Sequence, residues 1–322
     1  MTTTRKNVLV FRELPAGPLA RLQAEHEVTV ANPRRPDQAA AFFAALPAAQ
    51  GLIGSSFRID EAVLAQAPRL EVVSSISVGV DNYELPALRR RGILLSNTPG
   101  VLTDTTADTI FMLIMASSRR LFELALQVRE GRWTRNIDES QFGWDVHGKT
   151  LGILGFGRIG QALARRAALG FGMPVLYHNP FEVALPELGA RARHVPLAQL
   201  LRESDIVALT LPLSDDTRGL MGPAEFAVMK DGAIFVNGSR GAIVQEDALL
   251  ATLDSGRLRA AGLDVFAVEP LPLDSPLRTH PRVTALPHIG SATHETRHAM
   301  AELATTNLLQ GLAGLRPASV VG

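Results

Sequence analysis

The sequence predicts an α/β protein built from two doubly wound, parallel-sheet domains. Two series of short apolar segments alternate with helix-like segments, one over residues 1–99 and the other from Thr150 onward. Strands that alternate with helices favour parallel sheets, and strands that are apolar throughout are typical of sheets covered on both faces. The chain has 322 residues, more than one hydrophobic core usually spans, and this also favours two domains.

The first series predicts one sheet with its covering helices. The short apolar runs predict strands over residues 7–11, 27–30, 51–54, 72–76 and 93–95. The segments between them predict helices over residues 15–24, 60–67 and 85–91. Because the strands are joined through helices, they are expected to pair in parallel.

A long helix-like stretch over residues 103–130 follows the first series. Thr103 or Asp104 can cap its start, and Gly131 can end it. We therefore expect one helix, which could bridge two domains. Its wide apolar surface is compatible with a contact between subunits.

The second series predicts another sheet. Its strands are expected over residues 151–154, 174–177, 206–209, 233–236, 260–263 and 283–285. Its helices are expected over residues 159–168, 197–202, 223–229 and 246–254. A final helix, roughly residues 292–312, is expected to return to the first domain. The expected division is therefore residues 1–99 with 291–322 in one domain and 100–290 in the other.

Composition limits the classes of function. The chain has 32 basic and 32 acidic residues, so its formal net charge is zero and nothing in its bulk charge suggests binding to nucleic acid or to an anionic membrane. It has no cysteine, which excludes disulfides, thiolate metal sites and cysteine nucleophiles. No apolar segment is long enough for a signal-peptide core or a membrane span. We expect a cytoplasmic protein without membrane or nucleic-acid partners.

A glycine-rich loop, Gly155-Phe156-Gly157-Arg158-Ile159-Gly160, lies between a predicted strand and a predicted helix. In a dinucleotide-binding loop, the first two glycines permit a tight turn and close approach of a pyrophosphate, and the third lets helix and strand pack. Amide groups at the helix start then face the phosphates. A plain glycine turn is the alternative, but the strand and helix on either side favour dinucleotide binding.

The residue at the end of the next strand bears on the choice of coenzyme. A site that prefers NAD usually carries Asp or Glu about 20 residues after the loop, where it binds the ribose. This chain has Asn179, whose neutral amide does not repel a 2′-phosphate. Pro180 and Phe181 follow and bring no positive charge, which leaves Arg158 as the nearest candidate cation. We expect NADP to be weakly preferred over NAD.

Three residues near the end of the second series form a candidate catalytic set: Arg240, Glu269 and His288. Each lies just beyond a predicted strand, where sites form in open sheets. An imidazolium can donate a proton near neutral pH, a carboxylate partner favours that charged form, and a guanidinium fork can bind a substrate carboxylate. Singly, each is more often a structural or surface residue. Together, after a dinucleotide loop, they predict reduction of a 2-keto acid.

Further candidates are less specific. The amides of Val78 and Gly79, after the strand at 72–76, could hold a carboxylate, although an ordinary turn explains this segment equally well. Residues 55–57 and 142–144 could line a substrate pocket, with surface loop or core as the alternative. His294 and His298 are one helical turn apart, but no cysteine supports a metal pair, and we expect no metal.

The joint pattern of motifs resembles the D-isomer-specific 2-hydroxyacid dehydrogenases over essentially the whole chain. The resemblance rests on SVGVDN at 77–82, TADT at 106–109, GKTLGILGFGRIG at 148–160, LPLSDDT at 211–217, VNGSRGAIV at 236–244, GLDVFAVEP at 262–270 and LPHIGSATHETR at 286–297. Within the family, the chain is most similar to glyoxylate/hydroxypyruvate reductases and 2-ketogluconate reductases. NADP-using reductases of this group usually have an arginine just past the second strand, and this chain departs from that pattern.

The resemblance implies a flavodoxin-like substrate domain, a Rossmann-type coenzyme domain and a homodimer joined through the coenzyme domain. It implies that Arg240 binds substrate, Glu269 tunes the histidine and His288 donates the proton. Val78 and Gly79 would hold the substrate carboxylate. The remaining implied site residues are Ser291 for substrate and Gly155, Gly157, Arg158, Ile159, Gly160, Asn179, Pro212, Thr217, Gly238, Asp264 and Gly290 for cofactor, with Asp264 at the nicotinamide end or, alternatively, as a strand-end cap.

The expected activity is NAD(P)H-dependent reduction of a small 2-keto acid, such as glyoxylate, hydroxypyruvate or 2-ketogluconate, to the D-2-hydroxy acid. The alternative is an NAD(H)-sensing, corepressor-like binding protein without significant turnover, because some corepressors resemble this fold. Such proteins add extended tails. This chain has almost no extension beyond its final helix, which favours the enzyme.

Overall fold

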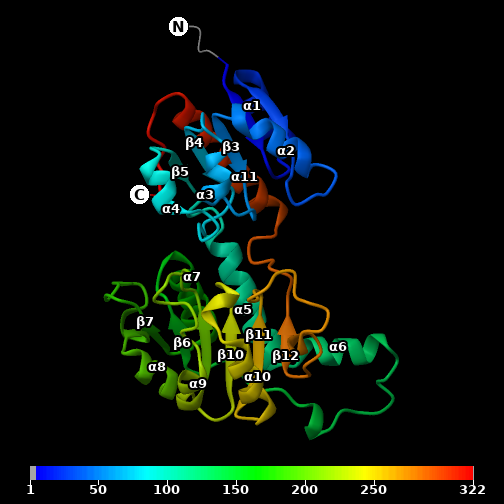
Figure 1. Ribbon diagram of the computed structural model, residues 1–322. Helices are drawn as coiled ribbons and strands as arrows, with labels where there is room; N and C mark the ends of the chain where they lie inside the picture. Colours follow the sequence, from blue (N-terminus) through cyan, green and yellow to red (C-terminus); the bar gives the residue numbers. More distant parts are fainter. Residues whose placement is uncertain (1–4, 322) are drawn as a thin grey trace. The chain divides into compact units, whose positions relative to one another are not determined.

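The computed structural model describes residues 5–321. The chain divides into two compact units. Unit 1 contains the residues up to Leu102 together with those from Ala292 onward, and unit 2 contains Thr103–Ser291. Each unit has its own parallel sheet with helices on both faces, so the predicted fold class is confirmed (Figure 1).

The sheet of unit 1 has five strands in the order β2-β1-β3-β4-β5. All of its neighbouring strands pair in parallel. The order reverses between β1 and β3, and the carboxyl ends of strands beside such a switch point are where open sheets bind ligands. The strands are β1 (Asn7–Val10), β2 (Glu27–Val30), β3 (Gly51–Gly54), β4 (Val72–Ser75) and β5 (Leu94–Ser96).

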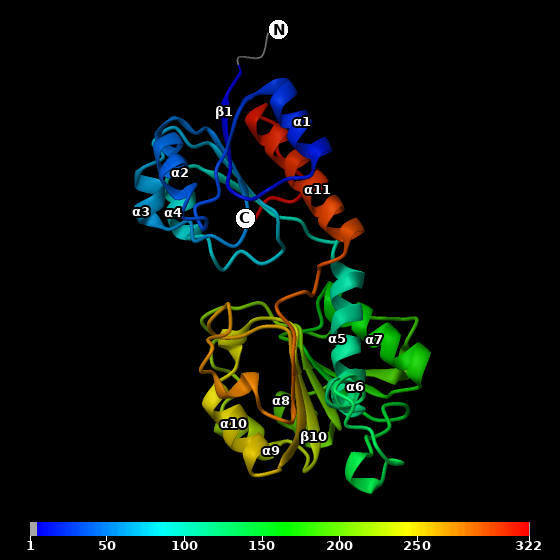
Figure 2. The same cartoon turned by 90° about the vertical axis from the view of Figure 1, so that its right-hand side faces the viewer.

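Helices cover both faces of this sheet. One face packs against α1 and α11, and the other packs against α2, α3 and α4 (Figure 2). Phe42, Leu64 and Leu88 anchor the second group of helices in a core that also includes Leu9 and Leu52. The helices are α1 (Ala16–Glu25), α2 (Ala39–Ala45), α3 (Glu61–Ala65), α4 (Leu85–Arg90) and α11 (His294–Leu312).

The sheet of unit 2 has seven strands in the order β12-β11-β10-β9-β6-β7-β8. All neighbouring strands are parallel, and the order reverses between β6 and β9, as in Rossmann-type sheets. The strands are β6 (Leu151–Leu154), β7 (Val175–His178), β8 (Ala192–His194), β9 (Ile206–Leu209), β10 (Ala233–Asn237), β11 (Leu258–Leu263) and β12 (Val283–Ala285).

Two hydrophobic cores lie on the two faces of this sheet. One contains buried residues of α5 and α7, and the other contains buried residues of α8, α9 and α10 (Figure 2). The sheet is thus covered on both faces, which explains its continuously apolar strands. The helices are α5 (Thr103–Ser118), α6 (Leu121–Arg129), α7 (Arg158–Arg165), α8 (Leu197–Glu203), α9 (Pro223–Val228) and α10 (Glu246–Asp254).

The predicted single helix over residues 103–130 is wrong, because α5 ends at Ser118 and α6 starts at Leu121. Arg120 lies between them in the left-handed conformation, with φ 54°. The backbone N–H of Trp144 donates to the carbonyl of Ser118 at 2.9 Å, so a distant segment takes an acceptor that a continuing helix would use. A side chain at Gly143 would collide with the backbone of Ser118, which shows how closely this segment approaches.

The prediction also missed α2 and β8, both short elements. β8 is an edge strand with exposed side chains, so it has no apolar pattern to reveal it. Among the described residues, no helix is both long and apolar enough to span a membrane. The remaining short segments are the 3₁₀ turns Leu46–Ala48, Glu139–Gln141, Gly189–Arg191, Gly241–Ile243 and Pro276–Arg278 and the π turn Arg166–Gly170.

Candidate active site

Three loops of unit 2 carry Arg240, Glu269 and His288. They follow β10, β11 and β12, which are consecutive neighbours in the sheet. Because the carboxyl ends of parallel strands meet at one edge, these loops lie side by side there (Figure 1). Contacts between the loops then determine how the three side chains are placed.

His288 and Glu269 form a direct pair. Nδ1 of His288 lies 2.7 Å from Oε2 of Glu269, and the other carboxylate oxygen accepts the N–H of Phe266 at 3.0 Å. An ionised carboxylate only accepts hydrogen bonds, so Nδ1 carries a proton and Nε2 is the nitrogen left for chemistry. The His288 side chain is 45% exposed, which leaves its ring accessible to a substrate.

Glu269 is held in its ionised form. Burial on its own would raise the pKa of this carboxyl, but the hydrogen bonds from His288 and the Phe266 N–H and the positive charges of His288 and Arg240 outweigh that effect. The net pKa of Glu269 is lowered. A negative charge therefore lies beside the imidazole, where the contact with Nδ1 orients the ring.

Asp264 fixes the turn that presents His288. Its two carboxylate oxygens accept the N–H groups of Ile289 at 2.7 Å and Gly290 at 2.8 Å. His288 itself has φ 55°, in the left-handed region that few non-glycine residues occupy. Asp264 is only 2% exposed, and burial raises its pKa. Asp264 thus caps the turn after β12, and its expected place at the nicotinamide end of the cofactor remains a prediction.

Arg240 is positioned by a residue that the sequence prediction missed. Asn237, at the end of β10 and 1% exposed, donates from Nδ2 to the Arg240 carbonyl at 3.0 Å. Its Oδ1 accepts both the backbone N–H and the hydroxyl of Ser239. An asparagine at a strand end often bonds to its own turn in this way, and that signal could have identified it. A side chain at Gly241 would collide with the backbone of Phe266, so this loop packs closely on the loop of Glu269.

The glycine loop has the geometry that a dinucleotide requires. Gly155 has φ 90°, and a side chain at Gly160 would collide with the Gly155 carbonyl, so loop and helix approach closely. A Cβ at Gly157 would have no atom within 4 Å, which shows open space beside the loop. No side chain caps the first turn of α7, so its amides suit a pyrophosphate. The loop lies beside the β6/β9 switch point, where such cofactors bind.

Asn179 contacts the glycine loop itself. Its Oδ1 accepts the N–H of Phe156 at 3.2 Å, and its Nδ2 donates to the carbonyl of Phe181 at 3.2 Å. Directly beside it, Nε2 of His194 lies 2.9 Å from the Asn179 carbonyl. Asn179, which is expected to lie at the ribose of the coenzyme, thus connects the end of β7 to the loop after β6.

The other predicted cofactor residues of unit 2 lie in loops after neighbouring strands. Thr217 donates to the carbonyl of Pro212 at 2.8 Å, within the loop that follows β9. Gly238 follows β10, and a side chain there would collide with Ile110 of α5. Ser291 is the last residue of unit 2, one residue after Gly290. Their contacts to a cofactor or substrate remain predictions.

Val78 and Gly79 belong to unit 1, in the loop after β4. Both carbonyls are engaged, since Asn97 donates to Val78 at 2.9 Å and Ser77 donates to Gly79 at 2.7 Å. The expected role of the Val78 and Gly79 amide N–H groups as a carboxylate site remains a prediction.

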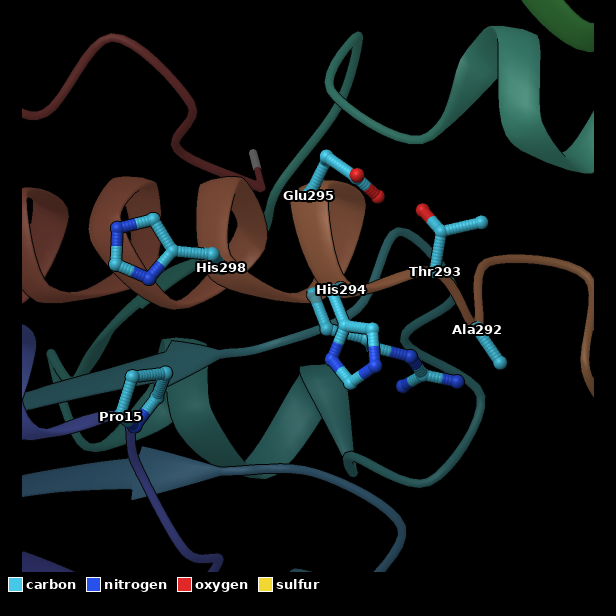
Figure 3. A pocket seen from close by; sticks show the side chains of 7 residues that line it. Pro15, Ala292, Thr293, His294, Glu295 and His298 are labelled. Carbon is cyan, nitrogen blue, oxygen red and sulfur yellow. The ribbon is translucent and has the colours of Figure 1, made fainter.

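A cavity of about 710 Å³ opens at the start of α11 and contains none of the predicted site residues. Thr293 caps the helix there by accepting the N–H of Thr296, and the rings of His294 and His298 point in different directions (Figure 3). Residues 5–321 contain no cluster of three or more histidine, cysteine, aspartate or glutamate side chains that could hold a metal ion. The cavity is lined by Pro15, Ala292, Thr293, His294, Glu295, Arg297 and His298.

Comparison with known proteins agrees with this geometry. Residues 111–290 match the model of the D-isomer specific 2-hydroxyacid dehydrogenase, NAD binding domain. The chain is 49% identical over 310 residues to glyoxylate/hydroxypyruvate reductase B of Klebsiella pneumoniae, with 96% of each chain covered.

Solved structures show the same likeness. The TT0316 protein of Thermus thermophilus is 43% identical, with TM-score 0.90 and 98% of this chain and 100% of that chain covered. An NADPH-dependent glyoxylate/hydroxypyruvate reductase of Sinorhizobium meliloti, solved with NADP and malonate, is 29% identical, with TM-score 0.88 and 99% and 97% of the two chains covered. The chain belongs to the D-isomer-specific 2-hydroxyacid dehydrogenase family.

Proposed function

We propose that the protein reduces small 2-keto acids, above all glyoxylate and hydroxypyruvate, to D-2-hydroxy acids. The observation that carries this proposal is the 2.7 Å contact between His288 and Glu269, at the sheet edge where the loop of Arg240 also lies. The relatives named glyoxylate/hydroxypyruvate reductase B, which match 96% of the chain, support this substrate class. Reduction of 2-ketogluconate is part of the same proposal.

As a family member, the protein is an NAD(P)-dependent 2-hydroxyacid dehydrogenase. A bound nicotinamide supplies the hydride. The glycine-loop amides would hold its pyrophosphate, and the Arg240 fork would bind the substrate carboxylate and polarise the keto oxygen. His288 then gives the proton on Nε2 to that oxygen as negative charge develops there, while Glu269 keeps the ring oriented and favours its charged form.

The Glu269→Gln substitution is expected to move the alkaline limb of the reductive pH–rate profile to lower pH. The lowered pKa of Glu269 keeps it negative through the working range, and reduction needs protonated His288. Removing that charge disfavours the protonated ring, so activity is lost at a lower pH than in the wild type. The matched control is Glu269→Asp, which keeps the negative charge, so the alkaline limb of its pH–rate profile should stay at the wild-type pH. If the alkaline limb of the Glu269→Gln variant also stays at the wild-type pH, the pairing of Glu269 with His288 is contradicted.

We propose a modest preference for NADPH over NADH, because Asn179 brings no charge that repels a 2′-phosphate. The Asn179→Asp substitution keeps the oxygen that accepts the Phe156 N–H and adds a negative charge. Selectivity, as the ratio of kcat/KM for the two coenzymes, should shift toward NADH by about tenfold or more.

The control variant is Asn179→Ala, which loses the hydrogen bond to Phe156. It should lower the binding affinity for NADPH and for NADH to the same extent. Dissociation constants for NADPH and NADH, measured by fluorescence titration, separate the two effects. The proposed role of Asn179 in coenzyme choice would be refuted if the wild type strongly prefers NADH. It would also be refuted if Asn179→Asp leaves the ratio of kcat/KM for the two coenzymes unchanged.

The experiment that tests the function is steady-state turnover on a keto-acid panel with both coenzymes. The panel contains glyoxylate, hydroxypyruvate, pyruvate and 2-ketogluconate, and rapid reduction of at least one of the first two is expected. Coenzyme binding without turnover on any of them would instead favour a corepressor-like sensor. No contact described above favours that second function.

We also propose a cytoplasmic homodimer that uses unit 2 as its interface. Large apolar side chains are exposed on α6 and on the segment that follows it, where a second copy could cover them. They are Leu121, Phe122, Val128, Trp133, Ile137 and Phe142, each more than half exposed. Light scattering coupled to gel filtration tests the assembly, and a monomeric mass at micromolar concentration would exclude it.

A further inference from the structure

A histidine of the edge strand β8 lies beside the residue expected at the coenzyme ribose. Nε2 of His194 is 2.9 Å from the backbone carbonyl of Asn179. Because a carbonyl oxygen only accepts hydrogen bonds, Nε2 carries a proton, and Nδ1 is the nitrogen that can take up a second one. Within residues 5–321, no hydrogen bond engages this Nδ1. The ring can therefore become an imidazolium without losing its bond to Asn179.

A column of aromatic rings holds the imidazole in place. Phe156 of the glycine loop stacks on Tyr177 with ring centroids 3.8 Å apart, and Tyr177 stacks on His194 with centroids 5.3 Å apart. Phe156 and Tyr177 are buried, and the Tyr177 hydroxyl donates to the Val183 carbonyl at 3.0 Å. His194, at the outer end of the column, is exposed. Its ring is thus fixed against the protein and open to a ligand.

The sheet places His194 next to the expected ribose site. Tyr177 and His194 are opposite each other in the parallel pairing of β7 and β8, so both strands end at the edge where the glycine loop lies. In a Rossmann-type sheet the pyrophosphate lies at that loop, and the ribose lies at the end of the following strand, here β7. β8 is the next strand outward, about 4.8 Å away. A group on the ribose that projects beyond β7 would therefore approach His194.

Most charged groups around His194 do not titrate near neutral pH. Arg193 lies 3.8 Å from Glu203 of α8, and Arg165 of α7 lies 2.7 Å from Glu187. Guanidinium groups stay protonated and carboxylates stay ionised at neutral pH, so their effect on a bound anion is constant there. The charged residues of the elements that adjoin β7 and β8 are Arg158, Arg165, Arg191, Arg193, Glu182, Glu187 and Glu203.

His178 is the other imidazole near this position. Its ring centroid is 6.3 Å from that of His194, and its Nδ1 lies 3.1 Å from the Val195 carbonyl. That bond directs His178 to the segment after β8, whereas His194 bonds directly to Asn179. An imidazolium is the charged form that appears and disappears near neutral pH, which makes His194 the leading candidate for a titrating cation at the ribose.

We propose that His194, in its protonated form, selects the 2′-phosphate of NADPH, so that the choice of coenzyme depends on pH. The inference rests on the proposed position of Asn179 at the ribose and supplies the cation that Asn179 lacks. An imidazolium attracts the 2′-phosphate, whereas NADH has only a hydroxyl there and gains little. Protonation is lost as pH rises, so the preference for NADPH should fall toward alkaline pH. Below about pH 6 the phosphate itself loses charge, so the preference should be greatest slightly above that pH.

Two coenzyme fragments test this selection without turnover. 2′,5′-ADP carries the 2′-phosphate, and 5′-AMP lacks it but is otherwise the same. Their dissociation constants are measured by titration calorimetry at several pH values. The ratio of the two constants should favour 2′,5′-ADP, and this advantage should fall about threefold to tenfold between pH 6.5 and pH 8.5, the size expected for an exposed ion pair.

Three variants assign the pH dependence to one ring. His194→Gln keeps an N–H for the Asn179 carbonyl but carries no charge, so the ratio should become independent of pH, with 5′-AMP affinity within about twofold of wild type. His194→Lys stays charged, so the ratio should remain high at pH 8.5. The matched control is His178→Asn, which keeps a donor for the Val195 carbonyl and should show the wild-type pH dependence.

Nuclear magnetic resonance of histidine-labelled protein follows the ring directly. The His194 signal is identified by its absence from the His194→Gln spectrum. Adding 2′,5′-ADP should move the titration of this signal to higher pH, because a neighbouring anion favours the imidazolium. 5′-AMP should leave it in place. Equal effects of the two fragments would contradict a contact between His194 and the 2′-phosphate.

The outcomes separate this inference from the proposed function. If keto acids are reduced but the fragment ratio does not vary with pH, or varies equally in His194→Gln, selection by His194 is wrong and the reductase stands. Loss of the dependence in His178→Asn alone would assign the cation to His178 and overturn the proposal. Equal weakening of both fragments in His194→Gln would show only a structural role. If neither fragment binds and no keto acid is reduced, both proposals are overturned.

Discussion

Replacing His288 with alanine is expected to lower reductive turnover by about 10²- to 10⁴-fold, the usual contribution of general acid catalysis. The ring is accessible, its Nδ1 is engaged by Glu269 at 2.7 Å, and Nε2 remains to deliver the proton. The backbone of this turn is held by Asp264 through Ile289 and Gly290, so the missing ring should leave the loop in place. Coenzyme affinity should therefore stay close to that of the wild type.

Stopped-flow reduction of hydroxypyruvate, with a parallel titration of NADPH, measures both quantities. The control is His298→Ala, an exposed histidine of α11 that lies outside the proposed catalytic set. If the His288 variant retains more than half of the wild-type turnover, another group donates the proton. A large loss of coenzyme affinity would instead show that the turn had collapsed.

The second large effect is expected for Arg240→Lys, although the substitution keeps the positive charge. Lysine lacks the planar fork that pairs with a carboxylate while polarising the neighbouring carbonyl. The Arg240 side chain is also set by a bond from Nη1 to the Ser239 carbonyl at 2.8 Å, which a lysine cannot reproduce with the same geometry. We expect kcat/KM to fall by about 10²- to 10³-fold, with both a higher KM and a lower kcat.

Steady-state kinetics with hydroxypyruvate at several pH values measures this loss. Asn237→Ala is an informative comparison, because the Asn237 side chain bonds to Ser239 and to the Arg240 carbonyl and should act through the placement of Arg240. The Asn237→Ala variant should reduce hydroxypyruvate more slowly than the wild type, with an unchanged pH dependence. An unchanged kcat/KM in the lysine variant would remove Arg240 from the substrate site.

The sequence alone determined the α/β class and the parallel sheets, because strand period, helix period and glycine turns are local signals. It also predicted that Arg240, Glu269 and His288 follow strands. Since those strands are neighbours in a parallel sheet, their loops meet at one edge, and the contact between Glu269 and His288 follows from that arrangement.

Only the tertiary structure decided features that depend on contacts between distant segments. The helix expected over residues 103–130 breaks because the segment at Trp144 binds the Ser118 carbonyl, a contact that no local pattern encodes. Asn179 matched the expected ribose position in sequence, yet only the fold shows its bond to Phe156.

The residues that hold the catalytic loops in place could not be predicted from the sequence, because their contacts also join distant segments. Asp264 holds two amides about 25 residues further along the chain, a separation over which sequence carries no pairing signal. Local sequence thus determined which residues carry the chemistry. The packing of remote segments determined what holds those residues in place, because the hydrogen bonds that do so join parts of the chain brought together only by folding.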